Sequence, residues 1–315
     1  MQIVVLDGYC VNPGDVDWAP LKALGTLSVY DRTHPDMVAQ RLRGAEAAFV
    51  NKVKLNRELL QNARQLKFVG VLATGYDVVD LDAARVRNIT VCNVPAYSTE
   101  AVAQHAIALL LALCQRVEYH AALVKKGAWT AQPDFAWWDI APVLLYGKTI
   151  GIVGCGRIGC RVARIASALG MRVLGTSPHE NPDFCGTPVP IETLLRESDV
   201  VSLHCPAKAD TLGLIRRDTI ATMKDGAFLI NTARGSLVSE ADVRDALEKG
   251  KLAGYGADVA SEEPVKLKNP LLKAKNCLLT SHYAWSPKPM RQKLIDISAE
   301  NLAAFLRGEP KNVVS

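Results

Sequence analysis

The sequence of 315 residues has no long hydrophobic run, no block of charge of one sign and no recognisable cysteine pattern. Its longest apolar run, Ala106 to Cys114, is too short to span a bilayer. The eight cysteines are scattered without CxxC pairs or metal-type His/Cys spacing, which argues against a metal site and against a disulfide framework. We therefore expect reduced, mostly buried thiols in a cytoplasmic protein with no membrane segment.

The charge is only mildly basic, at a formal +5 from 37 basic and 32 acidic side chains. No basic tract with interleaved aromatic residues is present, so nothing predicts a nucleic-acid partner. A weak basic balance suits an anionic cofactor and a small anionic substrate. The length favours two domains, because a chain of this size exceeds one ordinary core.

A glycine-rich segment between a strand and a helix is the strongest local signal. The β-branched run Thr149–Val153 precedes it, and apolar residues at helical spacing follow from Arg157 to Leu169. The segment itself reads Gly154, Cys155, Gly156, Arg157, Ile158, Gly159. In such a turn the glycines permit a tight bend, close backbone approach to a diphosphate and close helix packing. This context predicts a dinucleotide site; the alternative is a glycine-rich connection in another kind of α/β domain.

Short apolar strands alternate with helical segments in both halves of the chain. The first series has expected strands at 2–6, 47–50, 67–71 and 89–92, with helices at 36–42, 55–62 and 79–86. The second has strands at 149–153, 172–176, 200–203, 227–231, 254–259 and 277–280, with helices at 157–169, 191–196, 218–223 and 240–249. This alternation predicts two α/β domains, each a doubly wound parallel sheet. An apolar helix that opens at Ser98 should be buried on several sides, between domains or subunits.

Three polar side chains follow strands of the second series, where an α/β sheet places its chemistry. They are Arg234, an acid of the Glu262-Glu263 pair, and His282. Taken singly, each is more simply explained as a surface or structural residue. Together they are what hydride transfer to a 2-oxo acid needs: an arginine for the carboxylate or carbonyl, a histidine that supplies the proton, and an acid that orients it.

The chain resembles the D-isomer-specific 2-hydroxyacid dehydrogenases over essentially its whole length. The matching segments are 154–159, 223–227, 231–235, Asp258-Val259, Glu263-Pro264 and His282. The resemblance implies that Arg234, Glu263 and His282 are catalytic, with Glu263 chosen because the acid of the family directly precedes the proline. It also implies a Rossmann nucleotide domain at 96–286, a flavodoxin-like substrate domain at 1–95 and 287–315, and a homodimer that uses the helix after Ser98.

The same resemblance implies further binding residues. Cofactor contacts are expected at Gly154, Gly156, Arg157, Ile158, Gly159, Ser177, Cys205, Pro206, Thr211, Thr232, Ala233 and Asp258. Substrate contacts are expected at Asn51, Lys52, Thr74, Gly75, Arg234 and His282. Several segments resemble the glycerate dehydrogenase (hydroxypyruvate reductase) branch: 51–52, 93–99, 134–138 and Trp285. The expected substrate pair is thus D-glycerate and hydroxypyruvate, or glyoxylate.

Two positions depart from the family pattern. Ser177 stands where an acid normally binds the adenosine ribose, so no charge there repels the 2′-phosphate of NADP, although no arginine lies in the immediate loop either. We expect NAD, with NADP not excluded. Ser281 replaces the usual proline before the histidine. Alternative interpretations are a phosphoglycerate dehydrogenase-like enzyme and a dinucleotide-sensing corepressor-like binding protein.

Overall fold

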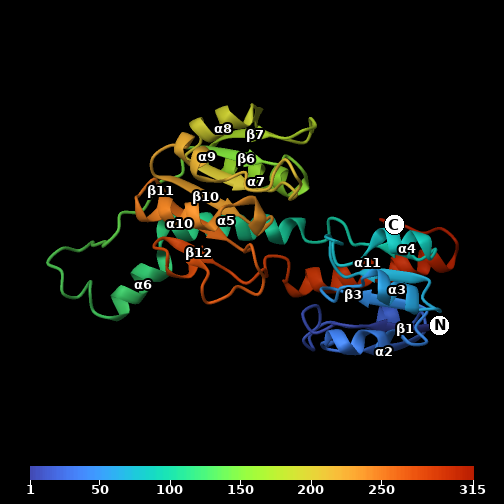
Figure 1. Cartoon of the computed structure of the whole chain (residues 1–315). Coiled ribbons are helices and arrows are strands. Elements are labelled where there is room, and N and C mark those ends of the chain that lie inside the picture. The colour runs from blue at the N-terminus through green and yellow to red at the C-terminus, as the bar shows by residue number, and fades with distance from the viewer. The chain divides into compact units, whose positions relative to one another are not determined.

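The computed structural model describes residues 1–315 as two compact units (Figure 1). The first comprises Met1–Ser98 and Trp285–Ser315, so the chain leaves it and returns; the second comprises Thr99–Ala284. Each unit is built around one sheet in which every strand pairing is parallel. The prediction of two doubly wound α/β domains is therefore confirmed.

The first unit has a five-stranded sheet in the order β2-β1-β3-β4-β5, which is the flavodoxin-like order. Its strands are β1 (Gln2–Val5), β2 (Thr26–Val29), β3 (Ala47–Val50), β4 (Phe68–Val71) and β5 (Thr90–Cys92). Its helices are α1 (Ala19–Lys22), α2 (Val38–Leu42), α3 (Arg57–Asn62), α4 (Leu81–Val86) and α11 (Lys288–Leu306), with a 3-10 turn η1 (Pro35–Met37). Apolar residues of α2, α3 and α4 form a core on one face, and those of α1 and α11 form a core on the other.

The second unit has a seven-stranded sheet in the order β12-β11-β10-β9-β6-β7-β8, a Rossmann order extended by one strand. Its strands are β6 (Thr149–Val153), β7 (Arg172–Thr176), β8 (Thr187–Pro188), β9 (Val200–Leu203), β10 (Ala227–Asn231), β11 (Leu252–Ala257) and β12 (Cys277–Leu279). Its helices are α5 (Thr99–Gln115), α6 (Val117–Lys125), α7 (Arg157–Ala168), α8 (Ile191–Glu197), α9 (Arg217–Thr222) and α10 (Glu240–Glu248), with 3-10 turns η2 (Gly235–Leu237) and η3 (Pro270–Lys273). Helices α5 and α7 cover one face, and α8, α9 and α10 cover the other.

Local sequence explains most element boundaries. All five residues of β6 are buried, as expected for a central parallel strand of β-branched residues. Helices α3 and α4 each begin after a residue whose carboxylate or amide oxygen accepts a backbone N–H in the first turn, Asn56 for Leu59 and Asp80 for Ala83. These caps satisfy donors that a helix start otherwise leaves unpaired.

The structure contains elements that the sequence did not predict, among them two strands and two helices, α1 being the shortest of the helices. Strands β2 and β8 were not predicted, because both lie at sheet edges and carry mostly exposed residues without an apolar run. Helix α6 was not predicted either, since none of its residues is buried. Helix α5 buries its apolar residues against the sheet and α7 of its own unit, and its burial between domains or subunits stays a prediction.

No single helix is long and apolar enough to cross a membrane, although α5 and α6, bent by 49° at their junction, pass that test as a pair.

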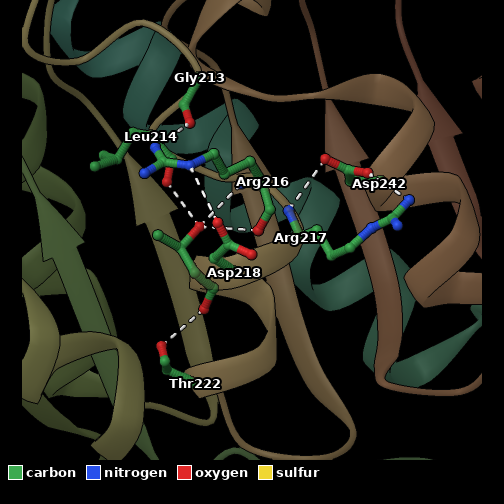
Figure 2. A network of polar contacts seen from close by, with 8 residues as sticks. Gly213, Leu214, Arg216, Arg217, Asp218, Thr222 and Asp242 are labelled. Atoms are coloured by element: carbon green, nitrogen blue, oxygen red, sulfur yellow. Dashed lines mark hydrogen bonds and ion pairs between the residues drawn. The ribbon is translucent and has the colours of Figure 1, made fainter.

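Polar contacts hold the start of α9 against α10. Figure 2 shows the backbone N–H of Arg217 donating to Asp242 Oδ2 over 3.1 Å, while its guanidinium reaches Oδ1 of the same carboxylate over 3.4 Å. The neighbouring Arg216 donates to the carbonyl of Gly213 over 3.1 Å. These contacts fix the helices on the face of the sheet that lies away from α5 and α7.

Candidate active site

The glycine-rich turn has the geometry of an anion site, and two of its three glycines stand where a side chain would not fit. Gly154 has a φ of +98°, and a Cβ there would lie 2.7 Å from the backbone of His204 and Cys205. A Cβ on Gly159 would lie 2.1 Å from the carbonyl oxygen of Gly154. A Cβ on Gly156, the N-cap of α7, would meet no atom within 4 Å, so no side chain or loop covers the start of the helix at this residue. An uncovered helix start after a glycine-rich turn is where a diphosphate binds.

The arginine turn after β10 is framed by a buried amide. Asn231 is fully buried, and its side chain accepts the N–H of Ala233 over 3.0 Å and donates to the carbonyl of Arg234 over 2.9 Å. The Arg234 side chain is exposed, with its Nη1 donating to the carbonyl of Ala233 over 2.7 Å. Gly235 follows, and a Cβ there would lie 1.9 Å from the carbonyl carbon of Ala260. This close approach places the arginine turn beside the loop that leads to the predicted acid.

The structure brings His282 and Glu263 into direct contact. His282 Nδ1 lies 2.6 Å from Glu263 Oε2, and both side chains are about one-third exposed. The second carboxylate oxygen, Oε1, accepts the N–H of Ala260 over 3.1 Å. The carboxylate is thus fixed at both oxygens, and it fixes one imidazole nitrogen in turn. This leaves Nε2 as the nitrogen that can exchange a proton with a substrate.

Sheet order explains why residues far apart in sequence meet. Strands β10, β11 and β12 are neighbours, and Arg234, Glu263 and His282 all follow their carboxyl ends. The glycine-rich turn follows the carboxyl end of β6 in the same sheet, at the point where the strand order reverses. Ligands of doubly wound sheets bind at this edge and at this reversal.

The predicted nicotinamide-side residues lie on the loops after β9 and β10. Cys205 and Pro206 follow β9, and the backbone of His204 and Cys205 lies against Gly154. Thr211 donates to the carbonyl of Pro206 over 2.8 Å. Thr232 and Ala233 follow β10, and Thr232 Oγ1 is buried without a hydrogen-bond partner. A buried hydroxyl without a partner, at the edge of the sheet where ligands bind, fits a bound polar ligand. The individual cofactor contacts of these residues stay predictions.

Asp258, a predicted cofactor contact, is held within the protein by the segment around His282, and its contact with a cofactor stays a prediction. It is 1% exposed, and its carboxylate accepts three donors from the segment around His282: the hydroxyl of Thr280 and the N–H groups of Tyr283 and Ala284. These bonds measure 2.6, 3.1 and 2.8 Å. The visible role of this carboxylate is to hold the histidine loop.

The loop after β7 carries Ser177, which is exposed and follows the strand directly. The loop is attached to the glycine-rich turn by Asn181, whose amide donates to the carbonyl of Cys155 over 2.8 Å. His179 and Glu180 are exposed on the same loop. The side of the site where an adenosine ribose is expected therefore has hydroxyl and imidazole groups, with a carboxylate on Glu180 but none at position 177.

The predicted substrate residues of the first unit also follow strand ends. Asn51 and Lys52 come after β3, and Asp7 accepts the N–H of Asn51 over 2.7 Å and of Lys52 over 2.5 Å. Thr74 and Gly75 come after β4, and the Thr74 hydroxyl donates to the carbonyl of Val94 over 2.9 Å. Both loops are held by side chains within their own unit, and their contacts with a substrate stay predictions.

Several supporting residues were missed by sequence reasoning: Asp7, His105, Asn181 and Asn231. The side chain of each forms a hydrogen bond with the backbone of a loop or with a hydroxyl group, and no motif in the sequence predicts such a contact. His105 had the clearest signal, as an imidazole within an otherwise apolar helical segment.

Known proteins match this chain over its whole length. A family model described as D-isomer specific 2-hydroxyacid dehydrogenase, NAD binding domain, matches residues 107–284. A hydroxypyruvate reductase from Blautia hydrogenotrophica is 48% identical over 322 residues, which cover 100% of both chains. A glycerate dehydrogenase from Methylorubrum extorquens is 39% identical over 282 residues, or 89% of this chain and 88% of the relative. The crystal structure of D-lactate dehydrogenase from Aquifex aeolicus, complexed with NAD and lactic acid, has a TM-score of 0.85 at 31% identity, covering 98% of this chain and 96% of that one.

Proposed function

Because the chain belongs to the D-isomer specific 2-hydroxyacid dehydrogenase family, we propose that it reduces hydroxypyruvate to D-glycerate with a reduced nicotinamide cofactor, and catalyses the reverse oxidation. The chain is an oxidoreductase with an NAD-binding domain. The choice of substrate rests on the relatives named hydroxypyruvate reductase and glycerate dehydrogenase. Glyoxylate, a smaller 2-oxo acid, is the second candidate.

The main structural support for this proposal is the contact between His282 and Glu263. When bound, the reduced nicotinamide supplies a hydride to C2 of the 2-oxo acid, and the carbonyl oxygen must gain a proton. Protonated His282 donates that proton from Nε2. Glu263, 2.6 Å from Nδ1, holds the imidazole in one orientation and stabilises its charged form. In the reverse reaction, neutral His282 accepts the hydroxyl proton.

Arg234 supplies the positive charge at this site. Its guanidinium can bind a carboxylate through two parallel N–H groups, or polarise the carbonyl as negative charge develops on the oxygen. The buried amide of Asn231 fixes the turn from which the side chain extends. A 2-oxo acid offers both groups that this arginine can bind.

The deciding experiment follows nicotinamide absorbance with purified protein and hydroxypyruvate, with NADH and NADPH in parallel. We expect rapid oxidation of at least one cofactor. Glyoxylate, pyruvate and 3-phosphohydroxypyruvate serve as the comparison panel, because a difference of one methylene in a pocket is worth only about 1–3 kcal/mol. A higher specificity constant for any of these than for hydroxypyruvate would contradict the proposed substrate.

We expect Ser177→Asp to shift cofactor preference toward NAD by about tenfold or more, equal to ~1.4 kcal/mol. The new carboxylate would bind the adenosine ribose hydroxyls and repel a 2′-phosphate. Ser177→Asn is the matched control, because it adds similar volume without charge. The ratio of specificity constants for NADH and NADPH measures the effect, and an equal ratio in both variants would show that charge at this position does not select the cofactor.

We further propose that the protein is a homodimer formed through the segment of the Rossmann unit that follows α5, from Val117 to Tyr146. Figure 1 shows this segment, with α6, extending away from the rest of its unit. Its exposed apolar side chains include Val117, Trp129, Phe135, Trp138, Leu144 and Tyr146, of which Phe135 is 93% exposed. A large exposed apolar surface of this kind is typical of a protein interface.

The dimer proposal predicts that Phe135→Asp combined with Trp138→Asp lowers the mass measured by light scattering from two chains to one. A charge buried in an apolar interface opposes association. Val86→Asp is the control, because Val86 is an equally apolar, 76% exposed residue on α4. A wild-type protein of single-chain mass at micromolar concentration would overturn the proposal.

A further inference from the structure

The segment that carries His282 depends on one buried carboxylate. His282 has a φ of +55°, a left-handed conformation that non-glycine residues rarely adopt without support from their surroundings. Asp258 supplies support on both sides, from the Thr280 hydroxyl before the histidine to the Tyr283 and Ala284 N–H groups after it. The position of the imidazole therefore depends on how firmly Asp258 and Thr280 are held.

A fourth group, His105 of α5, reaches the same carboxylate. Its Nε2 lies 3.0 Å from Thr280 Oγ1 and 3.6 Å from Asp258 Oδ1. Its ring also meets the Tyr283 ring edge-on, at 5.0 Å between centroids and 70° between planes. His105 thus contacts residues on both sides of His282, while its side chain is only 14% exposed.

The hydrogen bond between His105 and Thr280 has a definite direction, because the Thr280 hydroxyl carries a single hydrogen. The charged Asp258 Oδ1 at 2.6 Å is a nearer and stronger acceptor for this hydrogen than the Ala257 carbonyl at 3.3 Å. The Thr280 oxygen must therefore accept from His105, so Nε2 of His105 carries the proton. The chain of donors then runs from His105 to Thr280 to Asp258, and each donor makes the next oxygen a better partner.

The register between α5 and β11 explains why an imidazole is at this position. A Cβ on Gly254 would lie 3.0 Å from Leu113, and one on Gly256 would lie 3.0 Å from Leu109, so the helix lies directly on the strand at both glycines. Four residues of helix rise about 6 Å and two residues of strand about 6.6 Å. Leu113 thus faces Gly254, and Leu109 faces Gly256. Four residues further back along the helix and two further along the strand, His105 faces Asp258. The glycines bring the helix close enough for its side chain to reach the carboxylate.

We infer that His105 is a positioning residue for the reaction: it holds the His282 loop through Thr280 and Asp258 and touches neither the substrate nor the cofactor. This inference rests on the proposed role of His282. Without the Nε2 donor, the Thr280 hydroxyl loses its donor and the Tyr283 side of the loop loses its packing partner. The loop then samples positions in which His282 is misaligned with the carbonyl oxygen of the substrate.

Two substitutions separate the donor from the ring. His105→Gln places an amide N–H near the position of Nε2, whereas His105→Phe keeps an aromatic ring beside Tyr283 and removes the donor. We expect His105→Phe to lower kcat by about 10- to 100-fold, because a displacement of about 1 Å costs that much in an active site. We expect the dissociation constant of the dinucleotide to stay unchanged, and His105→Gln to recover most of kcat. Gln104→Phe, on the exposed side of the same helix, is the control.

The kinetic readout is the solvent deuterium isotope effect on kcat. Misalignment of His282 makes proton transfer slower relative to other steps, so the effect should rise in His105→Phe and stay at the wild-type value in His105→Gln. A purely structural role would lower the folded fraction and leave the isotope effect unchanged. Wild-type kcat in His105→Phe, or equal losses in both variants, would overturn the inference.

Thr280→Val keeps the test decisive if His105→Phe does not fold. It removes the hydroxyl that His105 binds, and we expect a similar loss of kcat and a similar rise in the solvent isotope effect, whereas Thr280→Ser, which keeps the hydroxyl, should retain most of kcat. Wild-type kcat in Thr280→Val, or equal losses in Thr280→Val and Thr280→Ser, would overturn the inference.

An activity-free readout separates this inference from the proposed function. In protein labelled with 15N-histidine, the Nδ1–H of His282, bonded to Glu263, should give a downfield NMR resonance in the wild type and in His105→Gln. We expect it to broaden or move upfield in His105→Phe, and an unchanged resonance would overturn the inference. Failure of the wild type to reduce hydroxypyruvate would contradict the proposed substrate and leave this comparison intact.

Discussion

Replacement of His282 by alanine should lower kcat for hydroxypyruvate reduction by about 10²–10⁴-fold, the usual contribution of a positioned general acid. The variant loses the imidazole that Glu263 holds through Nδ1, and with it the proposed proton donor Nε2. Dinucleotide affinity should change little, because the glycine-rich turn and the start of α7 lie at β6, four strands away from β12 in the sheet.

Steady-state kinetics and a binding titration with NADH measure these two quantities separately. His34→Ala is the control for loss of a histidine, because His34 lies in the other unit with a side chain that is 73% exposed. Retained turnover in His282→Ala would remove the proton-transfer role. A parallel loss of dinucleotide affinity would indicate instead that the loop had collapsed onto the cofactor site.

Replacement of Arg234 by alanine should lower kcat/KM by about 10²–10³-fold, which is the scale of losing one group that stabilises developing charge in a transition state. The exposed guanidinium makes a single hydrogen bond in the structure, to the carbonyl of Ala233, and its other N–H groups remain available to a ligand. Removal of the side chain should leave the turn intact, because Asn231 holds the backbone.

Arg234→Lys distinguishes charge from geometry. A lysine keeps the charge but cannot offer two parallel N–H groups to a carboxylate, so most of the loss should persist in this variant. Arg196→Ala, on the exposed face of α8, is the control. An unchanged specificity constant in Arg234→Ala would remove Arg234 from the site, and full activity in Arg234→Lys would show that its charge alone is used.

Prediction from the sequence worked best where few residue types can meet a local steric or burial requirement. Gly154, Gly156 and Gly159 were predicted from their spacing and flanking elements, and in the structure Gly154 and Gly159 stand where a Cβ would clash with backbone atoms, while the start of α7 at Gly156 is left uncovered. The alternation of strands and helices was sufficient for two parallel α/β sheets, because buried parallel strands read as continuous apolar runs. Edge strands β2 and β8 lack that pattern, and the exposed helix α6 has no buried face to produce a periodicity.

Residue types and their order along the chain were thus enough to predict the architecture, the anion-binding turn and the three polar residues at strand ends. The contact between His282 and Glu263, the use of Asp258 to hold the histidine loop, and the alignment of His105 with that carboxylate were decided by the tertiary structure. The physical reason is that these interactions depend on strand order and on the close approach of α5 to Gly254 and Gly256. Such distances are set by packing between segments far apart in sequence, which local propensity does not encode.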